Sequence, residues 1–382
     1  MRTEVRPLRL CFVGPAENVT TRRWVEWFTA RGHEATVLTV EPTRETHHFR
    51  QIDLSCTFGG RKVGRLVSVA RLASVARDLR PDVVHVHYLR GLAWGIPLVR
   101  LCPIVVTPWG SDVLEEQGAF KEWYSCALTK KAFASADLVA VHSRYMESRI
   151  RPLLPNGMPM VRVGWGINLQ IFRPGLDVEA LRQRWNLGRD RPIIFSPRLA
   201  QPCYRHDLVI RALSLIQKES PRVVLVISEQ FADLEYVRKL RTLVSDLNLD
   251  DHVRFTGSIP YSEMPLWMNV ADIMVMVPQS DGMPNTLWEA MACGALPVLN
   301  RLPQYAEVIE DGINGLVVEP DPEDMARVIL QALANQELKT KAGLRNRELV
   351  QTMADQDQEM ARMEGWYERL RETWPGRGAA GG

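Results

Sequence analysis

Two carboxylates, Asp281 and Glu289, have the residue type and spacing that most directly suggest chemistry. They lie eight residues apart in the segment SDGMPNTLWEAMACGALPVLN, residues 280–300. The pattern predicts Asp281 in the loop after an apolar strand and Glu289 within the helix that follows. A carboxylate one to two turns inside such a helix can accept hydrogen bonds from the hydroxyls of a ribose. The alternative is a capped core helix whose Glu289 faces solvent, although the small, apolar run LWEAMACG makes that placement difficult.

The start of this predicted helix offers a second kind of chemistry. Gly282 and Pro284 are expected to form a turn, and Asn285 or Thr286 to cap the helix. The free N–H groups and positive dipole end of a helix start suit a diphosphate. The residues assigned to this predicted diphosphate site are Asp281, Gly282, Met283, Pro284, Asn285 and Thr286.

Short apolar runs alternate with helical stretches along the chain. The strands and helices that they predict must position Asp281, Glu289 and the predicted helix start. The first series is LRLCFVG, ATVLTV, DVVHVH, PIVVTPWG and DLVAVHS, and the second is RPIIFSPR, RVVLVIS, HVRFTG, DIMVMVP, ALPVLN and GLVVE. This βαβ rhythm predicts parallel sheets with helices on both faces. Between the series, the glycines and Pro174 of GWGINLQIFRPG indicate a loop or hinge.

We therefore predict an α/β protein of two doubly wound, Rossmann-like domains. The first spans residues 1–172 and the second 173–354; a helix over 355–374 packs back toward the first domain, and 375–382 form a flexible tail. Open α/β sheets bind ligands at the carboxyl ends of their strands, so the site is expected in a cleft between the domains.

Composition restricts the class of protein. The hydrophobic fraction is 46% and the charged fraction 24%, as in ordinary soluble proteins. No uncharged apolar run reaches the length of about eighteen residues that a membrane span needs. The apolar run in MRTEVRPLRLCFVG is too short for a signal peptide, and the six cysteines include no C-x-x-C pair. These features predict a cytoplasmic protein with reduced thiols.

Charge is divided unevenly along the chain. Residues 1–175 hold 24 Lys and Arg against 15 Asp and Glu, whereas residues 176–382 hold 23 against 30. The basic half fits an anionic acceptor or an anionic membrane surface, and it lacks the dense basic stripes typical of nucleic-acid binding. The alternative is that opposite charges help the two domains to attract each other.

One helix in the basic half could lie on lipid. In RKVGRLVSVARLASVARDLR, residues 61–80, the expected packing residues are Leu66, Ala70, Ala73 and Leu79. The expected surface cations are Arg61, Lys62, Arg65, Arg71, Arg77 and Arg80. Peripheral contact at the inner face of the membrane is one reading; an ordinary helix covering a sheet is the other.

Nearly the whole chain resembles glycosyltransferase family 4, whose members are retaining enzymes of the GT-B fold. The spacing of Asp281 and Glu289 matches that family's carboxylate-x7-carboxylate signature, with Asp281 where most members have Glu. The other matching segments are LCFVGPAENV, ARGHEATVLT, PDVVHVHYLRG, VVTPWGSDV, VAVHSRYMES, GWGINLQIFRP, SPRLAQPCYRHDLVIRAL and VRFTGSIPYSEMPLWMNVADIMVMVP. The resemblance implies that Asp281, Arg198 and Glu289 are catalytic.

The resemblance also implies how the donor diphosphate is bound. In the family, an Arg after the first strand of the second domain and a Lys five residues later neutralise it. Arg198 stands at the Arg position, but Cys203 stands where the Lys is expected. Arg205, two residues on, is the candidate replacement, because a guanidinium can bind phosphate bidentately. The alternative for Arg205 is an ordinary surface residue at a helix start.

On the acceptor side, the family often has a His within a T-x-H-G-x-D-like segment. Here Trp109 stands at that position, followed by Gly110, Ser111 and Asp112. A tryptophan cannot do acid–base work, but its face could stack on a sugar ring. Nearby, His85 is expected to be a satisfied core histidine and His87 a candidate acceptor-side group. The acceptor-side candidates are therefore His87, Trp109, Ser111 and Asp112.

Three further segments concern the nucleotide. Gly14 resembles the glycine that lets the backbone approach the donor phosphate, while GPAEN is not the G-x-G-x-x-G of a nicotinamide site. Gly257, Ser258 and Ile259 resemble the loop that holds the base edge through its backbone. The family's glycine pair after the strand VVLVIS is replaced by Ser228, Glu229 and Gln230.

Together these features predict a retaining, metal-independent glycosyltransferase. Its co-substrate is a nucleotide-diphospho sugar, and its acceptor is a cell-surface polysaccharide, lipid-linked sugar or other glycan. No cofactor or metal is expected, because Arg198 and a helix start can stabilise the leaving diphosphate. Two alternatives are a sugar-nucleotide 2-epimerase of the same fold and a non-catalytic sugar-nucleotide-binding module.

Overall fold

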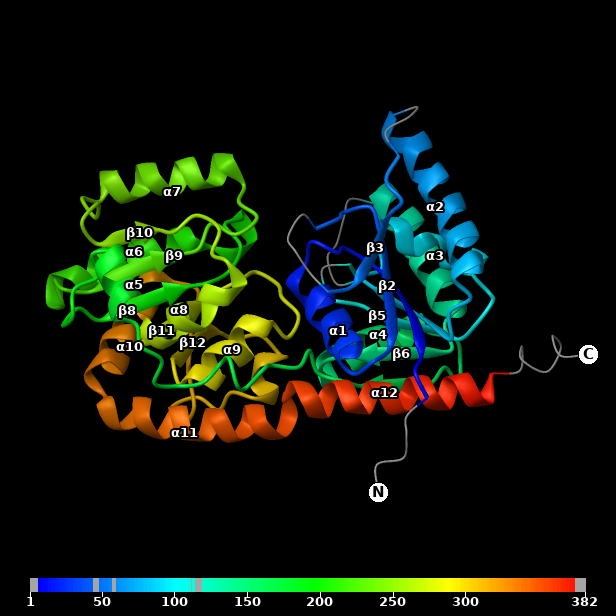
Figure 1. Ribbon diagram of the computed structural model, residues 1–382. Coiled ribbons are helices and arrows are strands. Elements are labelled where there is room, and N and C mark those ends of the chain that lie inside the picture. The colour runs from blue at the N-terminus through cyan, green and yellow to red at the C-terminus, as the bar shows by residue number, and fades with distance from the viewer. Residues whose placement is uncertain (1–5, 44–47, 57–59, 111, 114–118, 375–382) are drawn as a thin grey trace, which may run out of the picture. The chain divides into compact units, whose positions relative to one another are not determined.

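The computed structural model describes residues 6–43, 48–56, 60–110, 112–113 and 119–374 (Figure 1). Contacts divide the chain into unit 1, residues 1–165 with 357–382, and unit 2, residues 166–356. The boundary expected at 172/173 thus falls inside unit 2. The reason is packing: Ile167 and Phe172 are fully buried in a core of unit 2, and the Ile167 N–H donates to the carbonyl of Ala354. The expected tail, 375–382, lies outside the described residues.

Unit 1 contains a seven-stranded parallel sheet with the order β3-β2-β1-β4-β5-β6-β7. The strands are β1 (Arg9–Val13), β2 (Glu34–Thr39), β3 (Arg50–Asp53), β4 (Val83–His87), β5 (Ile104–Thr107), β6 (Leu138–Val141) and β7 (Met160–Arg162). Every residue of β4, β5 and β6 is buried. Continuous apolar runs are expected where helices cover both faces of a parallel sheet.

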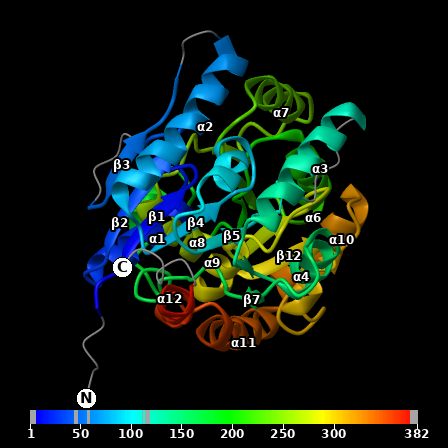
Figure 2. The same ribbon diagram turned by 90° about the vertical axis from the view of Figure 1, so that its right-hand side faces the viewer.

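The helices of unit 1 form two layers. They are α1 (Val19–Ala30), α2 (Gly60–Leu79), α3 (Ala119–Ala134), α4 (Arg144–Ile150) and α12 (Gln356–Thr373), with short 3₁₀ segments at Gly91–Leu98 and Arg151–Leu153. Helix α12 packs on the face that carries α1, where Tyr367 lies against Phe28. Helix α2 contributes Leu72 and Ala76 to the core on the opposite face (Figures 1 and 2).

The buried face of helix α2 differs from the face that the sequence predicted. Ser68, Leu72 and Ala76 are its buried face, whereas Leu66 is 72% exposed and Ala70 is also exposed. The expectation that Leu66 and Ala70 pack on the sheet was therefore wrong. Ser68, Leu72 and Ala76 recur every four residues and so lie on one face of the helix, whereas Leu66 and Ala70 lie on another. The side chains of residues 61 and 62 lie outside the described part.

Unit 2 contains a six-stranded parallel sheet with the order β10-β9-β8-β11-β12-β13. The strands are β8 (Ile193–Ser196), β9 (Val224–Ile227), β10 (Val253–Phe255), β11 (Ile273–Met276), β12 (Leu296–Asn300) and β13 (Leu316–Val318). Alternate strand residues enter separate cores on the two faces: Phe195 faces one and Ile194 the other.

Helices cover both faces of the second sheet. One core includes residues of α6 (His206–Glu219), α7 (Leu234–Asp246) and α10 (Pro322–Ala334); the other includes α5 (Glu179–Arg184), α8 (Met264–Val270), α9 (Asn285–Cys293) and α11 (Gln336–Met353). Short 3₁₀ segments occur at Pro202–Tyr204, Tyr261–Glu263 and Tyr305–Glu307. Within the described ranges, no helix is long and apolar enough to cross a bilayer.

Candidate active site

The strand order of unit 2 marks one position as the natural ligand site. Strand β8 lies between β9 and β11. The order of the strands reverses between β8 and β11: β9 and β10 follow on one side of this pair, and β12 and β13 on the other. Ligands bind in open α/β sheets at the carboxyl ends of strands beside such a switch point. Arg198 follows β8 and Asp281 follows β11. The fold therefore brings together two of the three residues expected to be catalytic.

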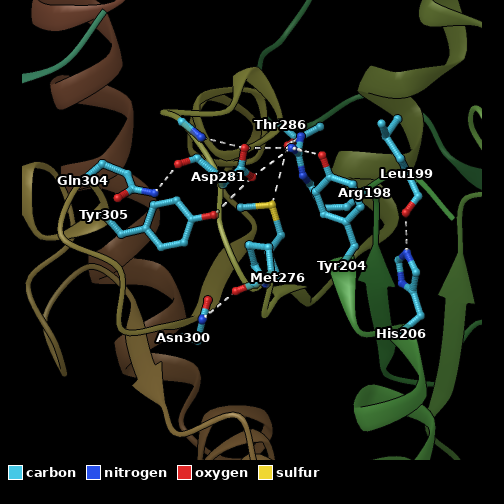
Figure 3. Close-up of polar contacts among 12 residues, drawn as sticks. Arg198, Leu199, Tyr204, His206, Met276, Asp281, Thr286, Asn300, Gln304 and Tyr305 are labelled. Atoms are coloured by element: carbon cyan, nitrogen blue, oxygen red, sulfur yellow. Dashed lines mark hydrogen bonds and ion pairs between the residues drawn. The ribbon is translucent and has the colours of Figure 1, made fainter. Parts of the chain in front are cut away.

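Arg198 and Asp281 form an ion pair at this switch point (Figure 3). The Arg198 Nη2 lies 2.8 Å from Asp281 Oδ2 and donates to Oδ1 at 3.0 Å. Only 15% of the Arg198 side chain and 10% of the Asp281 side chain are exposed. A shielded pair of this kind interacts more strongly than a surface ion pair.

Tyr204 is a partner of Arg198 that sequence reasoning missed. Its hydroxyl accepts a hydrogen bond from Arg198 Nη2 at 3.1 Å, and its ring centroid lies 4.6 Å from the guanidinium carbon. It directly follows Cys203, the position at which the family's Lys is absent. An aromatic residue there places a ring, not a second cation, beside Arg198.

Asp281 is held from several sides. The Gly282 N–H donates to its Oδ1 at 2.9 Å, and the Tyr305 hydroxyl donates to its Oδ2 at 3.4 Å. The Gln304 amide donates to its main-chain carbonyl at 2.7 Å (Figure 3). Sequence reasoning assigned no role to Gln304 or Tyr305, which follow β12.

Burial and neighbouring charges shift the pKa values of Asp281 and Arg198 in opposite directions. Burial raises the pKa of Asp281, and Arg198 and the Gly282 N–H lower it by less. For Arg198, burial works against the charged form, but Asp281, Tyr204 and Tyr305 together raise its pKa. The guanidinium is thus a permanent cation at a site where negative charge can be stabilised.

Helix α9 starts beside this pair but is not capped as expected. Pro284 is its N-cap, and Asn285 and Thr286 lie within the first turn, so the predicted side-chain cap was wrong. The Thr286 hydroxyl instead accepts from Arg198 Nη1 at 3.3 Å and donates to the Met276 sulfur. No side chain caps the helix start, whose dipole end favours an anion.

Glu289 lies one turn into α9 and is only 3% exposed. Its Oε1 accepts a hydrogen bond from the Tyr261 hydroxyl at 3.3 Å. The alternative placement on a solvated face is therefore excluded. Met283, also expected at the site, is 2% exposed and belongs to the core beneath α9, so its side chain supports the loop.

Arg205 lines a depression whose lining includes neither Arg198 nor Asp281. It adopts a left-handed backbone conformation, with φ of 53°, between the 3₁₀ turn and α6. It lines a cavity of about 760 Å³ together with Arg211, Tyr236 and Lys239. Its assignment to the diphosphate stays a prediction that these contacts do not support.

The loop expected to hold the base edge is bonded to the residues that replace the family's glycine pair. The Gly257 N–H donates to Glu229 Oε2 at 2.9 Å, and the Ser258 hydroxyl donates to Gln230 Oε1 at 2.7 Å. The Ile259 side chain is buried in the core of unit 2 and leaves only its backbone for a ligand.

In unit 1, Gly14 and His87 meet at the corresponding switch point between β1 and β4. A Cβ on Gly14 would lie 2.7 Å from the His87 carbonyl oxygen. The glycine is therefore required for close approach of two main chains, a reason different from the expected approach to phosphate. His85 is a satisfied core histidine, as predicted, because its ring nitrogens bond to Tyr367 and, at 2.7 Å, to Thr107.

Asp112 organises the turn that carries Trp109. Its Oδ1 accepts from the N–H groups of Trp109 and Gly110 at 2.9 and 2.8 Å, and its Oδ2 accepts from the Leu89 N–H at 2.7 Å. The carboxylate is thus bonded by the main chain, and its role on the acceptor side stays a prediction. Ser111, the neighbouring candidate, lies outside the described residues.

Replacing Asp112 with alanine is expected to destabilise unit 1. The buried N–H groups of Leu89 and Gly110 and the half-buried N–H of Trp109 would lose their acceptor. An unsatisfied buried group costs about 1–3 kcal/mol, so the free energy of unfolding should fall by at least about 2 kcal/mol. Urea denaturation measures this change. Asp137→Ala is the matched control, because the Asp137 carboxylate accepts from the Ile104 N–H at the start of β5. An equal or smaller loss for Asp112→Ala would contradict the organising role.

The two parallel sheets with helices on both faces define an α/β protein of the GT-B fold, and solved structures agree. Sucrose-phosphate synthase from Thermosynechococcus elongatus aligns with a TM-score of 0.81 and 20% identity over 94% of this chain and 98% of that one. Anabaena HepE in complex with UDP and glucose aligns with a TM-score of 0.81 and 16% identity over 95% of this chain and 100% of that one.

Family models match both units. Residues 177–349 match the model of glycosyl transferases group 1, and residues 9–143 match glycosyl transferase 4-like. The chain belongs to the group 1, family 4-like glycosyltransferases.

Among curated proteins, this chain is 31% identical over 192 residues to a GDP-mannose-dependent alpha-(1-6)-phosphatidylinositol monomannoside mannosyltransferase of Mycolicibacterium smegmatis. The match covers 48% of this chain and 49% of the relative. D-inositol 3-phosphate glycosyltransferase of Streptomyces scabiei is 25% identical over 264 residues, 65% of this chain and 59% of that protein. The chain thus spans about half the length of the curated relatives it matches.

Proposed function

We propose that this protein is a retaining, metal-independent glycosyltransferase that moves a sugar from a nucleotide-diphospho sugar to a glycan or lipid-linked acceptor. The observation that carries the proposal is the shielded Arg198 guanidinium beside the start of α9, at the switch point of unit 2. Family membership supports it, as do relatives named as sugar transferases.

The arrangement suits departure of a nucleoside diphosphate. Arg198 and the start of α9 would stabilise the charge that develops as the bond from the anomeric carbon to the phosphate oxygen breaks. The acceptor oxygen would form its new bond on the same face of the sugar, and the departing phosphate oxygen would take the acceptor proton. Retention follows from this geometry without an enzyme nucleophile. Glu289 would accept hydrogen bonds from the ribose, and the backbone of residues 257–259 would hold the base.

Transfer from labelled UDP- and GDP-sugars, with and without EDTA, tests the proposal. We expect product with the same anomeric configuration as the donor and an unchanged rate in EDTA, because Arg198 supplies the positive charge. Complete loss in EDTA that Mg²⁺ restores would contradict metal independence. Conversion of the donor to its 2-epimer without acceptor would indicate the epimerase, and binding without any turnover would indicate a binding module.

Nucleotide binding can be measured before the acceptor is known. A nucleoside diphosphate at 100 times its dissociation constant should stabilise the protein by about 2.7 kcal/mol. A thermal-shift comparison of UDP, GDP and ADP therefore identifies the base.

Peripheral binding to anionic lipid is a further part of the proposal, and the observed face of α2 gives it a sharper test. Val63 is 44% and Leu66 72% exposed on this helix, which also exposes Arg65 and Arg77. Exposed apolar groups beside cations can insert at an anionic interface, where each cation adds about 1 kcal/mol of attraction.

At low salt, more protein should therefore sediment with phosphatidylglycerol vesicles than with neutral vesicles. Leu66→Ser is expected to weaken retention. Leu344→Ser in α11 is the matched control, because Leu344 is 68% exposed in unit 2. If the protein sediments equally with both vesicle types, or if both variants sediment equally with anionic vesicles, α2 has only a structural role.

A further inference from the structure

A depression of about 760 Å³ in unit 2 is formed by α6 and α7, which contact each other on one face of the second sheet. Gln279 and Pro320 complete its lining, which includes neither Arg198 nor Asp281. We refer to it as the α6–α7 depression. Sites that bind small molecules commonly have volumes of about 300–1,000 Å³, so this one has the size of a ligand site.

Three cations line the α6–α7 depression: Arg205, Arg211 and Lys239. Lys239 forms an ion pair with Glu235 at 2.8 Å, so its charge is compensated within α7. In the part of the chain that the structure describes, the guanidiniums of Arg205 and Arg211 form no ion pair or hydrogen bond. A guanidinium can bind a phosphate through two parallel hydrogen bonds. Two uncompensated guanidiniums beside one depression therefore favour an anionic ligand.

The short turn before α6 gives Arg205 a different environment from that of its neighbour Tyr204. The Tyr204 hydroxyl accepts from Arg198, whereas Arg205 lines the depression. Between them the chain turns at Arg205, whose φ of 53° lies in the left-handed region that disfavours residues with a side chain. The Gln279 N–H holds this turn by donating to the Cys203 carbonyl at 2.8 Å. Arg205 is thus held beside the depression by the main chain.

One carboxylate and an apolar wall restrict the kind of anion that fits. The Tyr236 hydroxyl donates to Asp207 Oδ1 at 2.8 Å and accepts from the Asp207 N–H at 3.3 Å. Burial and the bond to Asp207 raise the pKa of Tyr236, so its hydroxyl remains a donor. The Asp207 carboxylate disfavours a polyanion, but its Oδ2 can accept from a hydroxyl of a ligand. Leu208 and Leu243 add apolar surface for a carbon skeleton.

We propose that the α6–α7 depression binds the phosphate monoester of a small polyol, at a site separate from the donor diphosphate. Arg205 and Arg211 bind the phosphate, Asp207 accepts from a hydroxyl, and the leucines contact the carbon skeleton. This site goes beyond the proposed transfer reaction, because its lining includes neither Arg198 nor Asp281. It also gives Arg205 an alternative to the predicted contact with the diphosphate.

The first test is isothermal titration of the full chain with sorbitol 6-phosphate, sorbitol and inorganic phosphate, each with and without saturating UDP or GDP. We expect sorbitol 6-phosphate to bind equally well with and without nucleotide. Inorganic phosphate should bind at least about tenfold more weakly, because it lacks the hydroxyls and carbon skeleton. Sorbitol should not bind measurably. Displacement of sorbitol 6-phosphate by the nucleotide, equal affinity for inorganic phosphate, or no binding would overturn the inference.

The second test removes one cation at a time, with Arg205→Gly and Arg211→Gln. Each should weaken binding of sorbitol 6-phosphate by about tenfold or more, because a charge-assisted hydrogen bond is lost. Glycine adopts the left-handed conformation readily, so Arg205→Gly keeps the turn, and its melting temperature should stay the same or rise. Arg238→Gln is the matched control, because Arg238 is an exposed cation of α7 outside the lining. Equal weakening in all three variants would indicate attraction to net charge alone and would overturn the inference.

Nucleotide affinity separates this site from the proposed function. Arg211→Gln should bind UDP or GDP as the wild type does. Weaker nucleotide binding in this variant would make the depression part of the donor site; the separate site would then be wrong, and the transferase proposal would stand. If the wild type bound no nucleoside diphosphate, the transferase proposal would be contradicted, whereas binding of sorbitol 6-phosphate that depends on Arg211 would still support the depression.

Discussion

Arg198→Ala is expected to lower transfer by about one to two orders of magnitude. A hydrogen bond to a charged group contributes about 1.5–3 kcal/mol, and the donor diphosphate would lose such a bond as its charge grows. The effect should appear in kcat/KM for the donor and in the affinity for the free nucleoside diphosphate. Near-normal kcat/KM would remove Arg198 from the donor site.

The same substitution is also expected to destabilise the fold. Arg198 and Asp281 are shielded partners, and removal of one partner of a buried pair costs about 3–5 kcal/mol because the other charge is left uncompensated. The double variant Arg198→Ala with Asp281→Asn removes both charges. It should recover most of the stability but none of the transfer, which separates the structural role of Arg198 from its catalytic one.

The stability of Arg198→Ala should depend on pH in a specific direction. Burial already raises the pKa of Asp281, and loss of Arg198 removes the main opposing influence. Between the ordinary carboxyl pKa and this raised value, the folded state binds more protons than the unfolded state, so stability falls as pH rises. The deficit relative to the wild type should therefore be smaller at about pH 5 than at about pH 8. A deficit independent of pH would mean that Asp281 finds another cation.

The parallel sheets, their helices and the placement of Arg198 and Asp281 at strand ends could be predicted from sequence, because apolar runs and loop residues are local signals. The Arg198–Asp281 ion pair itself could not. It forms because β8 and β11, far apart in sequence, are neighbours in the sheet. Gln304 and Tyr305 were missed for the same reason, since only the folded sheet brings the loop after β12 to Asp281. Tyr204 lies in the same loop as Arg198, and the 3₁₀ turn Pro202–Tyr204 places its hydroxyl where it accepts from Arg198.

Local geometry accounts for the expectations that were wrong. Asn285 or Thr286 was expected to cap α9, but Pro284, with an extended backbone, is the N-cap residue. In α2, Leu66 was expected to pack, but a helix with alanine and leucine on several sides carries little information about its rotation, and Ser68, Leu72 and Ala76 face the core. Arg205 adopts a left-handed backbone conformation after the 3₁₀ turn before α6, which sequence spacing does not reveal, and its assignment to the diphosphate stays a prediction.

Glu289→Gln is expected to have the second largest effect, because Glu289 is proposed to accept hydrogen bonds from the donor ribose. The change keeps the shape of a side chain that is 3% exposed, and it removes only the charge and one acceptor oxygen. Loss of a charge-assisted bond worth about 1.5–3 kcal/mol should weaken nucleoside diphosphate binding by about 10- to 150-fold. Isothermal titration with the preferred nucleoside diphosphate measures the affinity.

The ribose itself identifies the partner of Glu289. In the wild type, 2′-deoxy or 3′-deoxy nucleoside diphosphate should bind more weakly than the parent nucleotide by a similar factor, because a hydroxyl donor is missing. In Glu289→Gln that difference should largely disappear, since the interaction has already been lost. Tyr261→Phe is the control: it removes the Tyr261 hydroxyl that donates to Glu289 Oε1 and leaves both carboxylate oxygens able to accept from the ribose. It should therefore retain the discrimination against deoxyribose. Equal discrimination in Glu289→Gln and in the wild type would show that Glu289 is a core carboxylate bonded by Tyr261 and not a ribose ligand.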